Sequence, residues 1–146
     1  MKIGLPRKQK GAVAIEFALV FLIFFAVFYG IVTYSLPLLL MQSFTQSTAE
    51  AVRRSVALDP STPGYDTAVK AIATTELSRQ LAWIPAALNF NVATDASATY
   101  VGGVLKVSIS YPTSKLQQVI PFLTLPGIGQ VPNLPANLTA SSSLQF

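Results

Sequence analysis

The chain has 146 residues, 51% of them hydrophobic and only 11% charged. This argues against an ordinary cytosolic protein, because soluble domains carry about 25% charged residues. The sequence contains no histidine and no cysteine, which excludes disulfides, zinc–thiolate sites, thiol chemistry and histidine-based general-base catalysis. The net charge of +4 resides in the first ten residues, because six basic and six acidic side chains balance from residue 12 onward. We therefore expect no nucleic-acid partner.

Residues 17–41 form an apolar run without a charged side chain. As a helix the run would extend roughly 37 Å, more than a bilayer core of about 30 Å requires, so we predict a transmembrane helix. The alternative, a secretory signal peptide, has a shorter apolar region that ends at a small-residue cleavage site. Basic residues precede the run and the next one, Arg53, lies well beyond it. The positive-inside rule then places the N-terminus in the cytoplasm and the chain after residue 42 on the far side.

Pro37 lies inside this run, where it removes a backbone hydrogen bond, so we expect a kink or local unwinding between Tyr34 and Pro37. Beyond it a stripe of apolar and small residues continues at helical spacing: Met41, Phe44, Thr48, Ala51, Val52 and Ser55. This pattern predicts one long helix over about 13–58. Its first half would lie in lipid and its second half would be amphipathic, and the prolines and glycine of 58–64 would end it.

A second helix is predicted from residue 65 onward, with Asp66 as its cap and its end before Pro85. The apolar period then changes to two, which predicts three antiparallel strands with one buried face, over 88–94, 104–112 and 137–146. Gly102 and Gly103 mark the turn before the middle strand. The fold class is thus α+β, with a long N-terminal helix, a second helix and a small antiparallel sheet of about three strands.

Residues 118–136 contain four prolines and two glycines among apolar residues. That density predicts an irregular loop. Such an apolar loop either folds over the core of its own domain or forms a surface that contacts a partner.

The segment RKQKGAVAIEF, residues 7–17, places a carboxylate at the start of the membrane run. Carboxylates near the bilayer interior are costly and tend to be functional. Taken alone, Glu16 has a simpler explanation, because the N-terminal end of a helix favours a negative charge in reach of headgroup water.

Basic residues, a glycine, and a glutamate five positions later ahead of a long apolar run resemble the processing site of type IV pilin-like proteins. The stretch KGAVAIEFALVFLIFF in particular resembles the start of TadE-like pseudopilins of the Tad (tight adherence) pilus, and AEAVRRSVAL, GGVLKVSISYP and NLTASSSLQF are similar to later parts of that family. The resemblance implies that a prepilin peptidase cuts between Gly11 and Ala12, and that Glu16 neutralises the new terminal amine during assembly. Basic residues of the leader would set the topology: Arg7, Lys8 and Lys10. Phe17, where the major Tad pilins usually have tyrosine, and the length of the chain fit a minor pilin better than the main filament subunit.

The expected division is a leader over 1–11, an N-terminal helix over 12–58 that spans the membrane at about 17–41, and an extracytoplasmic, pilin-like α+β domain over 65–146. The resemblance implies a minor pilin or pseudopilin of the bacterial inner membrane, with its domain in the periplasm or outside the cell, that initiates, caps or assembles a Tad-type pilus for adhesion or surface colonisation. Its partners would be the membrane, the peptidase, other pilin subunits and the assembly platform. The alternative is an uncleaved single-pass scaffold of a secretion or envelope complex.

We expect no enzymatic activity, cofactor, metal or small-molecule substrate. Three aspartates that could serve catalysis lie at predicted turns or caps, where Asp is common for local hydrogen bonding: Asp59, Asp66 and Asp95.

Overall fold

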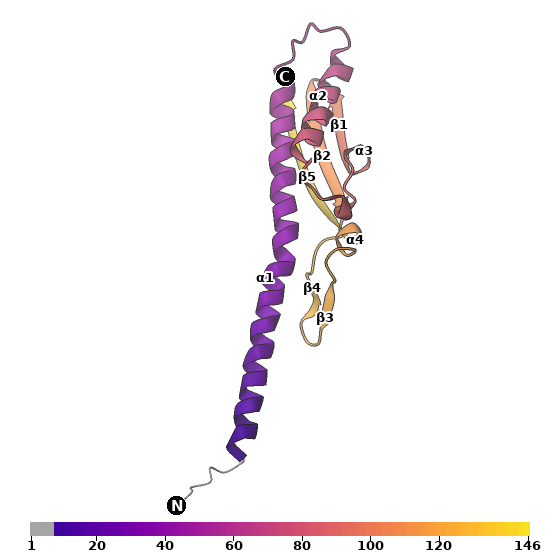
Figure 1. Ribbon diagram of the computed structural model, residues 1–146. Coiled ribbons are helices and arrows are strands. Elements are labelled where there is room, and N and C mark those ends of the chain that lie inside the picture. The colour runs from indigo at the N-terminus through magenta and orange to yellow at the C-terminus, as the bar shows by residue number, and fades with distance from the viewer. Residues whose placement is uncertain (1–7) are drawn as a thin grey trace, which may run out of the picture.

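The computed structural model describes the backbone of residues 8–146 and the side chains of residues 11–146. A long helix, α1, stands beside a small α+β domain that covers only its C-terminal part (Figure 1). The domain consists of a second helix and a three-stranded antiparallel sheet with short helices and a hairpin between them. The predicted α+β class is confirmed.

Helix α1 runs from Lys8 to Ser55 as one continuous helix of 48 residues, which corresponds to roughly 72 Å. Pro37 lies within it without interrupting it, so the helix does not unwind there, and the kink stays a prediction. The helix ends three residues before the expected Leu58, in a turn. The predicted stripe is confirmed: each of its members is buried except Met41, which is half-buried.

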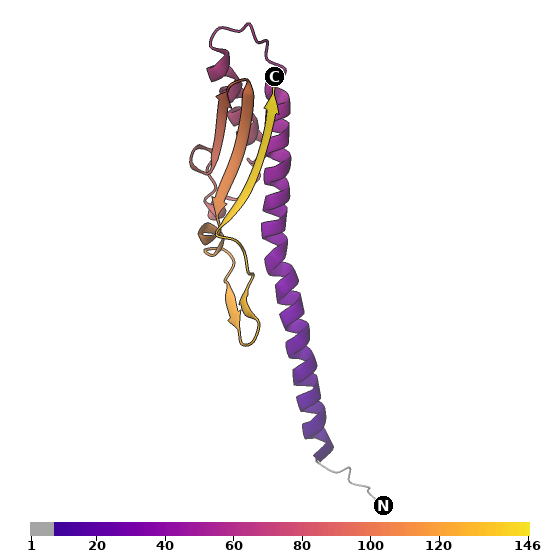
Figure 2. The same cartoon turned by 180° about the vertical axis from the view of Figure 1, so that it is seen from behind.

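The sheet has the order β1-β2-β5, with all neighbours antiparallel. The strands are β1 (Ala96–Val101), β2 (Val104–Pro112) and β5 (Asn137–Gln145). The alternation predicted for the middle strand is confirmed, because Leu105, Val107, Ile109 and Tyr111 are all buried. The last strand of the chain lies next to α1, the first helix (Figure 2).

Helix α2 (Tyr65–Gln80) packs beside α1 and over β1. Its N-cap is Gly64, with positive φ, and no side chain caps it. The prediction of Asp66 as the cap was wrong, because Asp66 lies within the first turn and pairs with Lys70 at 2.8 Å. Apolar residues at helical spacing are buried: Val69, Ala73 and Leu77.

The prediction of a strand over residues 88–94 was wrong. This segment forms a 3-10 turn, η1 (Ala86–Leu88), and a short helix, α3 (Val92–Asp95). Its polar side chains take up the backbone groups that a strand would pair: the Asn91 side chain accepts a hydrogen bond from the Ala93 N–H, and Asp95 accepts one from the Asn91 N–H, both at 2.9 Å. The first strand therefore forms later, at β1.

The core lies between the sheet and the two long helices. Phe44 of α1 is fully buried, and its ring lies 5.4 Å from that of Phe90 and 6.0 Å from that of Tyr111, measured between centroids. Buried aliphatic residues of α1 and of the other elements belong to the same core: Leu40, Leu77, Leu88, Leu105, Ile109 and Leu116. These side chains form one hydrophobic core between the sheet and the two long helices, and such a core allows a small domain to fold against one face of α1.

The sequence predicts an irregular loop over residues 118–136, but part of this segment is regular. A short helix, α4 (Thr113–Leu116), is followed by a hairpin of two three-residue strands, β3 (Leu123–Leu125) and β4 (Gly129–Val131). Three prolines flank these strands and none interrupts them: Pro121, Pro126 and Pro132. The hairpin extends from the domain alongside α1 toward the N-terminal end of that helix (Figure 1).

Candidate functional site

The N-terminal part of α1 has no cover within the protein. All residues from 11 to 25 are exposed, and aromatic rings stack along the helix at four-residue spacing, with centroids 6.1 Å apart for Phe17 and Phe21 and 6.3 Å for Phe21 and Phe25. An 18-residue window of this helix has a mean hydropathy of 2.6 and is not buried at all. Among the residues that the structure describes, α1 alone is long and apolar enough to cross a bilayer, and it indicates a membrane anchor.

Gly11, Ala12 and Glu16 lie in the first turns of this helix. Gly11 is exposed, and a Cβ placed on it would meet nothing within 4 Å. Glu16 follows Ala12 by four positions, so the two residues share one helix face. Side chains of a helix lean toward its N-terminus, so Glu16 leans toward the backbone nitrogen of Ala12.

The basic residues predicted to set the topology cannot be placed as side chains. Arg7 lies outside the described residues, and Lys8 and Lys10 belong to α1 with only their backbone described.

The domain first touches α1 about halfway along the helix. The Tyr29 hydroxyl donates a hydrogen bond to the Pro121 carbonyl, and the Asn133 N–H donates one to the Tyr34 hydroxyl at 2.8 Å. Thr33, between the two tyrosines, is the first fully buried residue of α1. A groove of about 300 Å³ follows, lined by residues of α1 and of the segment that leads into β5: Tyr34, Pro37, Leu38, Met41, Leu134, Pro135, Asn137, Leu138 and Thr139.

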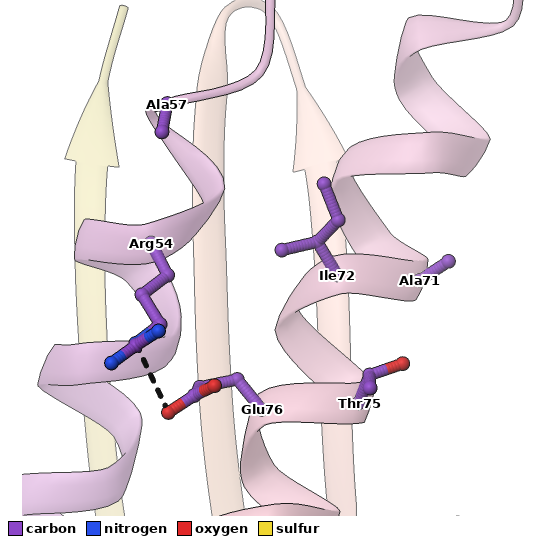
Figure 3. Close-up of a pocket in the computed structure, with 6 residues that line it drawn as sticks. All are labelled: Arg54, Ala57, Ala71, Ile72, Thr75 and Glu76. Carbon is purple, nitrogen blue, oxygen red and sulfur yellow. Dashed lines mark ion pairs between the residues drawn. The ribbon is translucent and has the colours of Figure 1, made fainter.

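At the far end of the domain an ion-pair cluster joins α1 to α2. Arg54 Nε lies 3.2 Å from Glu76 Oε1, and the two side chains point toward each other across a shallow pocket of about 490 Å³ (Figure 3). The hydrogen bond from Arg79 lowers the pKa of Glu76, with further help from Gln80 and Arg54, while burial acts in the opposite direction. The cluster is a structural link, because each of its charges already has an opposite partner.

The three aspartates considered for catalysis have local partners. Asp59 accepts hydrogen bonds from the N–H and hydroxyl of Ser61, which lower its pKa. Asp66 pairs with Lys70, and Asp95 pairs with Lys115 at 2.7 Å. Among residues 11–146 no three histidine, cysteine or acidic side chains lie close enough to hold a metal ion.

The structure thus adds contacts that sequence reasoning missed. In the sequence Tyr29 and Tyr34 are parts of an apolar run, Tyr34 at the start of the predicted kink, and no local pattern connects Arg54 with Glu76. A weak signal existed for the tyrosines, because a hydroxyl within a membrane segment requires a hydrogen-bond partner.

The comparisons with known proteins agree with the N-terminal motif. Residues 11–53 match the family model described as TadE-like protein. These residues make up nearly all of the described part of α1. No curated protein and no solved structure matches the chain.

Proposed function

Because the chain is a TadE-like protein by its N-terminal helix, we propose that it is a minor pilin of a Tad-type pilus. It would be anchored in the bacterial inner membrane, cleaved by a prepilin peptidase, and needed for initiation, capping or assembly of the filament in adhesion. The observation that carries this proposal is the family match over a helix whose first fifteen described side chains, residues 11–25, are all exposed. Such a helix can pass from lipid into a bundle of neighbouring subunits without disturbing the folded domain.

Cleavage would occur between Gly11 and Ala12. Gly11 lies in the first turn of α1, where the backbone N–H groups have no partners within the helix. Glycine also disfavours the helix by about 1 kcal/mol relative to alanine. Opening this turn into the extended form that a peptidase binds would therefore cost little.

Glu16 would pair with the amine that this cleavage creates. An ammonium in a bilayer is very costly unless a carboxylate compensates it. Glu16 lies one turn from Ala12 on the same helix face and leans toward it, which favours pairing within one chain. The same carboxylate could also pair with the amine of a neighbouring subunit.

The domain would lie on the periplasmic or outer side and have a structural, non-enzymatic role. Its partners would be other pilin subunits, the assembly platform and the peptidase. The competing function is an uncleaved membrane-anchored scaffold of a secretion or envelope complex, which needs the same anchor but has no use for Gly11.

The intact mass of the protein extracted from membranes separates the two functions. We expect a chain that starts at Ala12, and we expect Gly11→Val to retain the full leader and to abolish piliation. Gly30→Val is the matched control, because Gly30 is also a glycine of α1 with open space around it, and it should be processed normally. An unprocessed wild-type chain, or normal piliation by Gly11→Val, would contradict the proposal.

Glu16→Gln tests the pairing separately from cleavage. We expect this variant to be cut at the normal site but to fail in assembly, because the amide cannot neutralise the amine. Glu16→Asp keeps the charge on a shorter side chain and should recover part of the assembly. Equal piliation by Glu16→Gln and the wild type would remove Glu16 from the mechanism.

A further inference from the structure

The hairpin of β3 and β4 is held to α1 at its two ends. The Tyr29 hydroxyl donates a hydrogen bond to the Pro121 carbonyl, and the Asn133 N–H donates one to the Tyr34 hydroxyl at 2.8 Å. Residues 121–133 are here called the clasp. Its two strands pair only with each other, and neither is among the elements that pack closely on α1. The clasp is therefore attached to the helix mainly by the hydroxyl contacts at its ends.

The clasp lies beside the part of α1 that is expected to cross the membrane. Beyond Tyr29 it continues along the helix toward the N-terminal end, and both views agree on this placement (Figures 1 and 2). Each strand of the clasp has three residues, which reach roughly 10 Å, the rise of about seven helical residues. The tip of the clasp therefore lies N-terminal to Tyr29 along the helix axis, well inside the predicted span over 17–41.

The clasp is unsuited to the hydrocarbon core of a bilayer. Both outer edges of its two-stranded sheet are unpaired, and open sheet edges do not occur in contact with lipid, because nothing there satisfies the backbone groups. Thr124 and Gln130 lie opposite each other in the sheet and both are exposed, so one face of the clasp is polar. A bilayer over residues 17–41 would submerge all of these polar groups.

Moving the bilayer toward the N-terminus does not remove this conflict. The segment of α1 that is fully exposed, residues 11–25, is roughly 22 Å long as a helix, whereas a bilayer core is about 30 Å thick. The residues ahead of this segment include Lys8 and Lys10, and charged side chains are costly in the hydrocarbon region. A helix that spans the bilayer and a clasp that is closed on this helix therefore exclude each other.

Opening the clasp would free enough helix for a full span. The first residue of α1 in the buried core of the domain is Leu40, so residues 17–36 can then lie in lipid and provide the about 20 residues that a span needs. Ile120 and Leu134, on either side of the clasp, pack against the core. The clasp can therefore turn about these two points while the core stays closed.

We propose that the clasp is a conformational switch that responds to the surroundings of α1. It is open while residues 17–36 span the bilayer, and it closes on the helix when this segment leaves lipid. Closing gives the hydroxyls of Tyr29 and Tyr34 their hydrogen-bond partners and leaves Thr33 buried. The structure shows the closed form. The inference rests on the membrane anchor alone and does not require that the protein join a pilus.

Pulsed electron paramagnetic resonance in bilayers of two thicknesses tests the switch. The chain has no cysteine, so Ile31→Cys and Ile128→Cys together place two spin labels on the full chain, at positions that are 66% and 72% exposed. The vesicles contain didecanoyl or dierucoyl phosphatidylcholine, with the protein highly diluted in lipid. The thin core suits the short segment left by a closed clasp, and the thick core requires the full span. Val56→Cys with Val101→Cys is the matched control, because both residues are exposed and lie outside the clasp.

We expect one short distance between positions 31 and 128 in didecanoyl vesicles and a longer, broader distribution in dierucoyl vesicles. The control distance should be the same in both lipids, because the core stays closed. Gly11→Val should give the same results, so failure of the pilin function leaves this test intact. An identical distribution between positions 31 and 128 in the two lipids would overturn the switch.

Labelling of single cysteines shows whether the open clasp has left the lipid. In dierucoyl vesicles a membrane-impermeant maleimide should modify Ile128→Cys as fast as Val101→Cys, and Ile31→Cys much more slowly. A closed clasp cannot give this pattern, because its tip lies nearer the N-terminal end of α1 than Ile31 does. Protection of Ile128→Cys would place the clasp in lipid, and rapid labelling of Ile31→Cys would place residue 31 outside the bilayer. Either result would overturn the proposal.

Discussion

Arg54 of α1 and Glu76 of α2 form the ion pair that fixes the two long helices relative to each other, at 3.2 Å between Nε and Oε1. The Glu76 side chain is only 8% exposed and also receives hydrogen bonds from Arg79 Nε at 3.1 Å and Gln80 Nε2 at 2.6 Å. A carboxylate held this way is more acidic when the domain is folded. The link between the helices therefore depends on pH.

Glu76→Gln should change how the domain responds to acid. The pKa of Glu76 lies below its usual 4.5 in the folded state, so its contribution is complete above about 4.5 and is lost as the pH falls toward the folded value. We expect the variant to be less stable at neutral pH, on the order of 1 kcal/mol, and to lose less on acidification. Thermal unfolding of the full chain in detergent between neutral and acidic pH measures both effects. Asp66→Asn, which affects only an exposed pair with Lys70, should keep the wild-type profile, and an equal acid response in Glu76→Gln would refute the assignment.

Phe44→Ala should destabilise the domain strongly. The ring is fully buried against Phe90 and Tyr111, and removing a buried aromatic side chain costs about 3–5 kcal/mol. Phe28→Ala is the control, since Phe28 is 54% exposed on the same helix and its loss should leave the unfolding of the domain unchanged. Comparable melting temperatures for the two variants would show that the core does not centre on Phe44.

Gly103→Ala should be more harmful than Gly102→Ala. Both glycines have positive φ in the β1–β2 turn, which disfavours any residue with a Cβ by about 1–2 kcal/mol. A Cβ on Gly103 would in addition lie 3.0 Å from the carbonyl oxygen of Phe146, whereas one on Gly102 meets nothing within 4 Å. Chemical denaturation should therefore rank the wild type above Gly102→Ala and Gly102→Ala above Gly103→Ala, and the reverse order of the two variants would contradict the contact.

Tyr111→Phe should make the stability of the domain less dependent on pH in the alkaline range. Burial, with a smaller effect of the nearby Asp95, raises the pKa of Tyr111 to about 12, above its usual 10. The neutral phenol therefore stabilises the fold fully below about pH 10, and this contribution is lost as the pH rises toward 12. The variant should be less stable at neutral pH by about 1–3 kcal/mol, because the Leu88 carbonyl loses its 2.7 Å hydrogen bond, and its stability should fall less between pH 10 and 12. Absorbance of the ionised tyrosine during unfolding provides the measurement, and a Tyr111 that titrates at its usual pKa would contradict it.

The sequence predicted best those elements whose burial follows a simple period. The helical stripe through Phe44 and the alternation around Ile109 both bury the predicted face. The segment around Asn91 also alternates, but its Asn and Asp side chains capture local backbone groups and turn the chain, so period alone gave the wrong element. The high proline content of residues 118–136 predicted no regular structure there, yet β3 and β4 form because the prolines lie outside the two strands.

The candidate site was predicted only in its local part. The spacing of Gly11 and Glu16 can be read directly, because four or five positions on a helix define a distance. The contacts of Tyr29 and Tyr34 join residues 92 and 99 positions apart, and no local pattern encodes them. The face of α1 that the domain covers depends on these contacts, and hydropathy alone does not show where that cover begins.

The position of β5 between β2 and α1 also determines when the domain can fold. Helix α1 and strand β5 are far apart in the sequence, yet they are neighbours in the fold, and Thr48 Oγ1 of α1 lies 3.1 Å from Ser142 Oγ of β5. The part of α1 that β5 covers therefore remains uncovered until the chain has been made as far as β5. Contacts between segments so far apart in the sequence form slowly, so we expect α1 to form its helix before β5 covers it, and the buried Leu138 and Ala140 of β5 to be among the last residues to enter the core.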